Sequence, residues 1–227
     1  ASEARLRVYD PVTGEDRAIG TGLGDAVPPN TNFVKLAQSS SSSARPNTIF
    51  ALTQDLEGGR QLFQIDITTG RALPALVNGS NLITTLPGTP AFFGGSGDAA
   101  FDPNNPNRLL VNTRGPGGNM ALYAIDIRTN VAQFIGETSL PDVGGSLAFG
   151  EDGRLYAVSS SRLYLLPSEP VADYAQQVED RGFVGDFTDF ATLPIPTPVV
   201  DLDAVKQSTA GAVSVGDTIT YTITVTN

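Results

Sequence analysis

The sequence predicts an all-β fold of repeated four-stranded units, followed by a C-terminal extended β segment. The first observation is a recurring segment, present as RLRVYDPVTG (residues 5–14), QLFQIDITTG (61–70) and ALYAIDIRTN (121–130). Its aspartates, Asp10, Asp66 and Asp126, are 56 and 60 residues apart, a spacing typical of repeat architectures. Second, Gly (24) and Pro (16) are abundant, which favours short strands and tight turns. Third, the longest segment with helical character, residues 170–182, is sufficient for only a few turns.

The recurring segment predicts a strand that runs into a tight turn. Residues alternate over 62–65 as in a strand, and an aspartate follows where the turn begins. An Asp side chain accepts hydrogen bonds from backbone amides two residues further on. Gly or Asn ends each copy, and these residues adopt positive φ at the lowest cost. The three repeat turns therefore run from Asp10 to Gly14, from Asp66 to Gly70 and from Asp126 to Asn130.

Further strands are predicted around these turns. The outer strand after each turn is expected at EDRAIG (15–20), RALPALV (71–77) and VAQFIGE (131–137). Two strands precede the second copy, NFVKLAQ (32–38) and NTIFALTQ (47–54), and two precede the third, GDAAFDP (97–103) and NRLLVNTR (107–114). A fourth set begins with SLAFG, RLYAVSS and RLYLLP, within residues 145–167. Each unit thus has four strands, whereas the first unit shows only its last two.

Four strands per unit, with pairs such as LAFGEDGRLYAV, resemble the blades of a β-propeller. The resemblance is to bacterial propellers with NHL-like and quinoprotein-like repeats, and it covers roughly residues 5 to 190. It implies a β-propeller-like domain over residues 1–191. The motif encodes blade geometry and implies no particular chemistry. A β-sandwich built from similar hairpins is the alternative fold.

A change of composition separates the C-terminal part. TLPIPTPVV (192–200) contains three prolines and is expected to be an extended linker. Residues 201–227 resemble the opening of an immunoglobulin-like repeat domain of bacterial surface proteins. The matching residues are Asp201, Leu202, Lys206, Gly216, Asp217, Thr218, Ile219, Thr220, Tyr221, Thr222, Ile223, Thr224, Val225, Thr226 and Asn227. That family's domain continues for several more strands, so the resemblance implies a partial immunoglobulin-like segment.

Composition narrows the classes of function. The net charge of −10 disfavours nucleic-acid binding, because an acidic surface repels phosphate. No run of 18 apolar residues is present, so no membrane-spanning segment is expected. Cys and His are both absent, which excludes thiolate nucleophiles, Cys/His zinc sites and histidine-dependent triads. We therefore expect no enzyme, no organic cofactor, and no catalytic, cofactor-binding or metal residues.

Several polar motifs have a structural interpretation as well as a chemical one. The serines of residues 39–43 suggest a nucleophile or a glycosylation site, but a flexible loop explains them better. DPNNPN (102–107) and GEDG (150–153) offer oxygen ligands for calcium, yet neither has EF-hand spacing and both lie where a turn is needed. The glycines of GGSG (94–97) and GPGG (115–118) lack the lysine of a phosphate loop.

Two further motifs are candidate functional sites: a group of acidic residues and a glycosylation sequon. Asp186 and Asp189, near Asp180, raise the option of a carboxylate pair for glycoside hydrolysis, whereas solvated loop carboxylates explain them more simply. Asn78 begins an NGS sequon, which matters only in a glycosylating secretory pathway.

The last ten residues before Asn227 alternate strictly. Ile219, Tyr221, Ile223 and Val225 alternate with threonines, so we interpret them as an assembly strand that buries one face. The rest of an immunoglobulin-like domain, the chain's own blades or a neighbouring molecule by β-strand addition would cover such a strand. Self-docking is disfavoured by the proline linker, and we favour the neighbouring molecule.

These observations favour a non-enzymatic extracellular or cell-surface protein with a structural or adhesive role. Its expected partners are copies of itself, assembled through the C-terminal strand into a homo-oligomer or filament. The opening ASEARL resembles a mature N-terminus left after cleavage at a small-residue site. An artificially trimmed chain would begin in the same way. The alternative is a carbohydrate-binding or glycan-processing propeller with a surface glycan as partner. That function needs aromatic platforms, yet aromatic residues are only 7% and Trp is absent.

Overall fold

The chain forms two compact units, residues Ala1–Thr192 and Leu193–Asn227. The computed structural model describes residues 5–10, 12–28, 31, 33–46, 48–53, 60–92, 97–141 and 145–184, and the backbone of residues 203–208 and 221–226.

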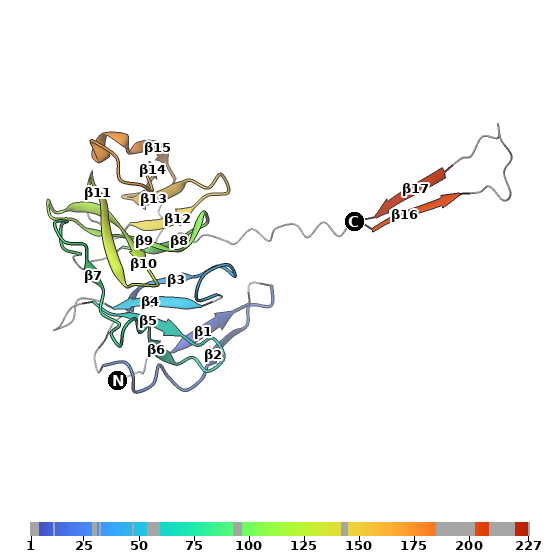
Figure 1. Ribbon diagram of the computed structural model, residues 1–227, viewed down its shortest axis with the longest axis horizontal. Coiled ribbons are helices and arrows are strands. Elements are labelled where there is room, and N and C mark those ends of the chain that lie inside the picture. Colours follow the sequence, from blue (N-terminus) through green and yellow to red (C-terminus); the bar gives the residue numbers. More distant parts are fainter. Residues whose placement is uncertain are drawn as a thin grey trace. The chain divides into compact units, whose positions relative to one another are not determined.

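The N-terminal unit is an all-β, propeller-like array of antiparallel sheets, which we call blades (Figure 1). The half-blade consists of β1 (Leu6–Tyr9) and β2 (Asp16–Ile19). Blade 1 contains β3 (Phe33–Gln38), β4 (Ile49–Thr53), β5 (Leu62–Ile65) and β6 (Ala72–Pro74). Blade 2 contains β8 (Ala99–Asp102), β9 (Asn105–Arg114), β10 (Asn119–Asp126) and β11 (Val131–Pro141). Blade 3 contains β12 (Ser146–Phe149), β13 (Leu155–Ser159), β14 (Arg162–Leu166) and β15 (Glu179–Phe183). The predicted four-stranded units are confirmed, and the first unit does show only its last two strands.

Two elements differ from the sequence prediction. Blade 2 carries a fifth strand, β7 (Thr84–Thr85), which runs parallel to the start of β11. Two residues are too few to show an alternation, so no sequence pattern indicated it. The segment with helical character, residues 170–182, contains one 3-10 turn, η1 (Tyr174–Gln177), and then β15. Tyr174 is buried, so the turn serves to insert one aromatic side chain into the core.

Apolar clusters fill the spaces between consecutive sheets. Blades 1 and 2 have an apolar cluster on each face, which explains why a central strand such as β10 is apolar almost throughout. One cluster between the half-blade and blade 1 contains Leu6, Ala51, Phe63, Ile65 and Ala72. The next, between blades 1 and 2, includes Phe50, Leu62, Ala99, Val111 and Tyr123. The third, between blades 2 and 3, includes Leu110, Leu122, Leu147, Ala157 and Tyr174.

The three repeat turns share one geometry. The aspartates Asp10, Asp66 and Asp126 accept hydrogen bonds from the backbone amides of Val12, Thr68 and Arg128 at 2.8, 2.8 and 2.9 Å. The residues at the last position, Gly14, Gly70 and Asn130, have φ of 73°, 72° and 55°. This is the positive-φ geometry that the sequence pattern predicts. At the third turn, buried Asn130 also donates from Nδ2 to the Ala75 carbonyl at 2.8 Å, so that turn is joined to blade 1.

The described residues of the C-terminal unit form a hairpin. Strands β16 (Asp203–Ser208) and β17 (Tyr221–Thr226) pair antiparallel over their whole length, with Asp203 opposite Thr226 and Ser208 opposite Tyr221. Three residues of the predicted assembly strand, Tyr221, Ile223 and Val225, thus lie in β17. Ile219 and the predicted linker, residues 192–200, lie outside the described residues.

Candidate functional site

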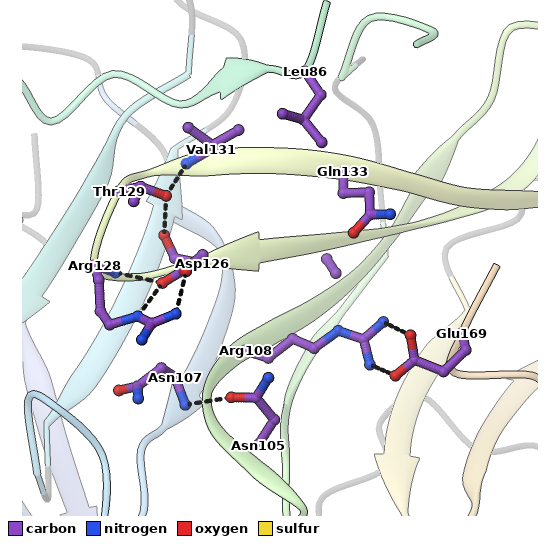
Figure 2. A pocket seen from close by; sticks show the side chains of 11 residues that line it. Leu86, Asn105, Asn107, Arg108, Asp126, Arg128, Thr129, Val131, Gln133 and Glu169 are labelled. Carbon is purple, nitrogen blue, oxygen red and sulfur yellow. Dashed lines mark hydrogen bonds and ion pairs between the residues drawn. The ribbon is translucent and has the colours of Figure 1, made fainter.

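A cavity of about 530 Å³ opens at the edge of the interface between blades 2 and 3 (Figure 2). Its floor is one end of the blade 2 sheet, where β9 begins and where β10 turns into β11. Arg108 pairs in register with Asp126, which in turn lies opposite Val131. Successive residues of a strand point to opposite faces, so Ala124 and Asp126 share a face. The register of the sheet thus places Arg108, Asp126 and Val131 side by side on the neighbouring strands β9, β10 and β11.

Arg108 connects the cavity wall to blade 3. Its Nη1 and Nη2 donate to the two carboxylate oxygens of Glu169 at 2.5 and 3.0 Å. Nη1 also donates to Asp102 Oδ2 at 3.1 Å, and Nη2 to the Ser168 carbonyl at 2.6 Å. A planar guanidinium suits this two-bond pairing with a carboxylate. Figure 2 shows the side chain of Arg108 extending to Glu169 alongside the cavity.

The second charged pair of the cavity is local. Arg128 donates from Nε and Nη2 to the two carboxylate oxygens of Asp126 at 3.0 and 2.7 Å. The hydrogen bonds from the Arg128 side chain, followed by the one from its amide, lower the pKa of Asp126 below its ordinary value. The same pairing raises the pKa of Arg128. Both groups therefore stay charged near neutral pH.

The cavity presents paired charges and amides more than reactive groups. Each of its two carboxylates, on Asp126 and Glu169, is already held by an arginine. Asn105, Asn107 and Gln133 add amide groups to the lining. Such an arrangement suits hydrogen bonding to a small polar molecule. General acid–base catalysis instead needs a carboxyl or imidazole group with access to the substrate proton.

The acidic motifs expected as turns are turns in the structure. Asp102 accepts from the Asn104 amide at 2.8 Å while pairing with Arg108. Asp152 accepts from the Arg154 amide at 3.0 Å and from the Tyr156 hydroxyl at 2.8 Å. These bonds, that of Tyr156 first, lower the pKa of Asp152.

The carboxylates near the end of blade 3 are only partly described. Asp180 is paired with Arg162 at 2.8 Å, and this contact lowers the Asp180 pKa. Asp186 and Asp189 lie outside the described residues, as do residues 94–96 of the GGSG motif.

The serine segment lies in the loop between β3 and β4, as the sequence predicts, and hydrogen bonds join several of its polar groups. Ser39 is buried, and its hydroxyl donates to the Arg45 carbonyl at 2.6 Å and accepts from the Thr48 amide at 3.0 Å. The Ala44 amide donates to Asn107 Oδ1 at 2.6 Å, which joins the segment to blade 2. Serine hydroxyls satisfy backbone groups inside a tight loop, so the composition reflects hydrogen bonding as well as solvation.

The glycines of GPGG enclose a carboxylate of the same chain. The amides of Gly117 and Asn119 donate to the two oxygens of Glu137, each at 3.1 Å. A Cβ on Gly115 or Gly117 would collide with that carboxylate. The loop therefore binds an anionic group, as a glycine-rich loop does, but this group is a side chain from the neighbouring strand β11.

Two structural findings concern metals and membranes. In the described ranges, no three His, Cys, Asp or Glu side chains form a group that could hold a metal ion. Within the same ranges, no helix has the length and apolar character needed to cross a membrane.

The NGS sequon lies in a tight turn, where Asn78 is exposed with φ of 51°.

Sequence reasoning did not identify Arg108 or Glu169. One signal was present, because the fourth set of strands has PSEP at 167–170 where the other copies have the Asp-to-Gly turn. This departure from the repeat is the place where Glu169 contacts blade 2.

Comparison with known proteins gives structural likenesses only. No protein-family model and no curated protein matches the chain. The structure of TolB from Acinetobacter baumannii is similar over 73% of this chain and 35% of that chain, with 16% identity and a TM-score of 0.40. A DUF4784 family protein from Bacteroides caccae is similar over 81% of this chain and 46% of that chain, with 14% identity and a TM-score of 0.35. The chain thus covers less than half the length of each.

Proposed function

We propose that this protein is a non-enzymatic, extracellular structural or adhesive protein that assembles with copies of itself through the β16–β17 hairpin. The blades are propeller-like, their sequence resembles NHL-like and quinoprotein-like repeats, and the sequence of the C-terminal segment resembles the start of an immunoglobulin-like surface domain. In this proposal the blades form a rigid head and the hairpin is the connecting element.

The observation that carries the proposal is the two-stranded sheet of the C-terminal unit. A hairpin of two strands is marginally stable in water unless further strands or a core cover it. Among the described residues, β16 and β17 pair only with each other, so each leaves one edge available. A strand edge of this kind adds readily to another sheet, and the alternation of Tyr221, Ile223 and Val225 with threonine suits a strand with one buried face.

The contacts that the carboxylate side chains make give further support to a structural role. Asp10, Asp66 and Asp126 hold the repeat turns, Glu137 fills the GPGG loop, and Asp102 pairs with Arg108. These acidic side chains stabilise local structure. That use agrees with a scaffold more than with an acid–base enzyme, whose carboxyl groups must face a substrate.

The proposal is tested by sedimentation velocity of the full chain over a wide concentration range, together with electron microscopy. Self-association into oligomers or filaments is expected for the natural sequence. The double variant Ile223→Lys/Val225→Lys should then sediment as a monomer. The matched control Thr222→Lys/Thr224→Lys adds the same charge at the alternate positions and should still associate. A natural chain that stays monomeric at every concentration contradicts the proposal.

The cavity beside Arg108 favours a second candidate, a carbohydrate-binding function. Amide and charged side chains such as Asn105, Gln133 and Arg128 resemble the polar groups with which proteins hydrogen-bond sugar hydroxyls. A glycan array probed with the natural chain and with Gln133→Ala tests this function, and a parallel assay for released sugar tests glycan processing. Glycan binding that the substitution abolishes would favour this candidate over the structural role.

A further inference from the structure

The connection between the last two strands of blade 3 is longer than its equivalent in blade 2. Residues 127–130 join β10 to β11, whereas residues 167–178 join β14 to β15. A longer connection in one unit of a repeat array extends beyond the common framework, and such additions often form the binding face. Residues 167–178, which we call the wall segment, supply Glu169 to the lining of the cavity beside Arg108.

The wall segment is fastened to blade 2 at two points. At the first, Glu169 and the Ser168 carbonyl accept hydrogen bonds from Arg108 on β9. At the second, the ring of Tyr174 lies so close to Gly136 on β11 that a Cβ there would overlap it. The cavity thus lies between two consecutive four-stranded sheets whose facing surfaces are in contact. These contacts form the cavity before any ligand is bound, as is usual for ligand sites.

Four side chains of the lining have hydrogen-bonding groups without a partner in the part of the chain that the structure describes. The Gln133 amide makes no hydrogen bond there (Figure 2). Arg128 uses Nε and Nη2 for Asp126, which leaves its Nη1. Asn105 and Asn107 each accept a backbone hydrogen bond through Oδ1, which leaves both Nδ2 groups. The cavity therefore offers several donors and, at Gln133, one acceptor.

The charged groups of the lining are already neutralised. Asp126 pairs with Arg128, and Glu169 pairs with Arg108, which also holds Asp102. Positive charge is not in excess among these groups, so the cavity has little attraction for an anion. A cation would have to compete with a guanidinium for either carboxylate of the lining. This arrangement favours a neutral ligand.

Apolar surface lies beside the polar groups. Leu86 is 40% exposed, and its amide donates to the Ala132 carbonyl on β11 at 3.0 Å. Leu86 directly follows β7, which runs parallel to the start of β11, so it lies near Val131 and Gln133 (Figure 2). We call Leu86 and Val131 the apolar strip. Apolar surface next to a few placed amides suits a ligand that combines an apolar side chain with neutral polar groups.

We propose that the cavity binds a neutral, extended peptide segment of a partner protein, with one apolar side chain on the apolar strip. Peptide carbonyl groups accept hydrogen bonds from Arg128 and Asn105, and a peptide N–H donates to Gln133. A sugar could meet the same amides, but the described lining has no aromatic side chain on which a sugar ring could stack. The inference is independent of assembly through the hairpin and gives the blades a binding site of their own.

NMR titration of the isotope-labelled full chain tests the inference, because the side-chain amides of Gln133 and Asn105 give their own signals. The probes are the capped tripeptide acetyl-Ala-Leu-Ala-amide, the same peptide with Asn, Glu or Lys at its centre, and maltotriose. We expect the leucine peptide to shift both side-chain signals at concentrations up to about 5 mM, where even millimolar ligands are bound. It should bind about fivefold more tightly than the asparagine peptide, since only leucine buries apolar area on the strip.

Substitutions then locate the binding site. Gln133→Ala should weaken binding of the leucine peptide about fivefold by removing a hydrogen bond. Leu86→Asn should weaken it by about the same factor through lost apolar contact. The matched controls Gln176→Ala and Leu73→Asn replace exposed residues outside the lining and should leave the affinity unchanged. All four positions are exposed, and the backbone signals report whether each variant keeps its fold.

Each other outcome overturns the inference. Equal or tighter binding of the glutamate or lysine peptide would show that the cavity selects for charge. Peptide binding that Gln133→Ala and Leu86→Asn leave unchanged would place the peptide elsewhere. Shifts with maltotriose and not with the leucine peptide would favour the carbohydrate-binding candidate. Absence of shifts with every probe would exclude this ligand class, while self-association through the hairpin, measured separately by sedimentation, would stand or fall by itself.

Discussion

Arg108 of blade 2 and Glu169 of blade 3 form an ion pair of two hydrogen bonds, with N–O distances of 2.5 and 3.0 Å. The partners differ in environment, since the Arg108 side chain is 10% exposed and that of Glu169 is 68% exposed. Asp102 lies on the buried side of Arg108, with a side chain that is 7% exposed. Arg108 thus neutralises one buried and one exposed carboxylate at the interface between two blades.

The first prediction compares the two ends of this contact. Arg108→Met leaves the Asp102 carboxylate buried without its cation, so it should reduce the free energy of unfolding by about 3–5 kcal/mol. Glu169→Gln removes only an exposed partner and should cost about 1 kcal/mol or less. Urea unfolding measures both. Adding Asp102→Asn to Arg108→Met should recover part of the loss, and equal costs for the two single variants would falsify the assignment.

The second prediction uses two glycines with the same backbone conformation. Gly14 and Gly70 have φ of 73° and 72°. A Cβ at Gly14 meets no atom within 4 Å, whereas at Gly70 it would overlap the Ile19 carbonyl oxygen at the end of β2. Gly14→Ala should therefore cost only the strain of positive φ, about 1–2 kcal/mol. Gly70→Ala should cost more, because the half-blade must also shift away from blade 1.

Thermal and urea unfolding of the two glycine variants measure the difference. Gly70→Ala should also raise proteolytic cleavage near Asp10, since the half-blade loses its contact. Equal stabilities for the two variants would show that the turn of blade 1 does not support the half-blade.

The blades could be predicted from the sequence because their determinants are local. An aspartate and a Gly or Asn four residues later specify each repeat turn through bonds within the turn, as at Asp66 and Gly70. Alternation then places strands on either side. Repetition at a similar spacing indicates that the units stack, since a single blade cannot bury both of its faces.

The candidate site could not be predicted, because its contacts are distant in sequence. Arg108 and Glu169 are 61 residues apart, and no periodicity links them.

The third prediction concerns a glycine in β11. A Cβ on Gly136 would overlap the ring of Tyr174, whose hydroxyl donates to the Pro167 carbonyl at 2.8 Å. Burial raises the Tyr174 pKa well above its ordinary value, so the phenol remains a neutral donor. Gly136→Ala should cost about 1–3 kcal/mol by overpacking. In a Tyr174→Ala background the same substitution should cost close to nothing.

A double-mutant cycle by urea unfolding measures this coupling. The control is Ser139→Ala, a substitution at an exposed position of the same strand, which should change stability little in either background. A cost for Gly136→Ala that persists after removal of the Tyr174 ring would place its origin in the backbone of β11.

The last prediction is a loss of stability in acid that depends on the repeat turns. Hydrogen bonds from backbone amides and nearby side chains lower the pKa of Asp10, Asp66 and Asp126 below the ordinary value of 3.8. A carboxyl whose pKa is lower in the folded state stabilises the fold above its unfolded pKa. That contribution is lost as the pH falls from about 4 through the folded pKa values.

The triple variant Asp10→Asn/Asp66→Asn/Asp126→Asn keeps a side-chain oxygen at each turn and removes the titration. Its free energy of unfolding should be lower than that of the natural chain at pH 7. It should also fall less between pH 5 and pH 2, because only the natural chain takes up protons at these turns as it unfolds. Urea titrations across this range measure both slopes, with Asp25→Asn as a control outside the three repeat turns. Parallel slopes for the natural chain and the triple variant would show that the turn carboxylates do not govern acid stability.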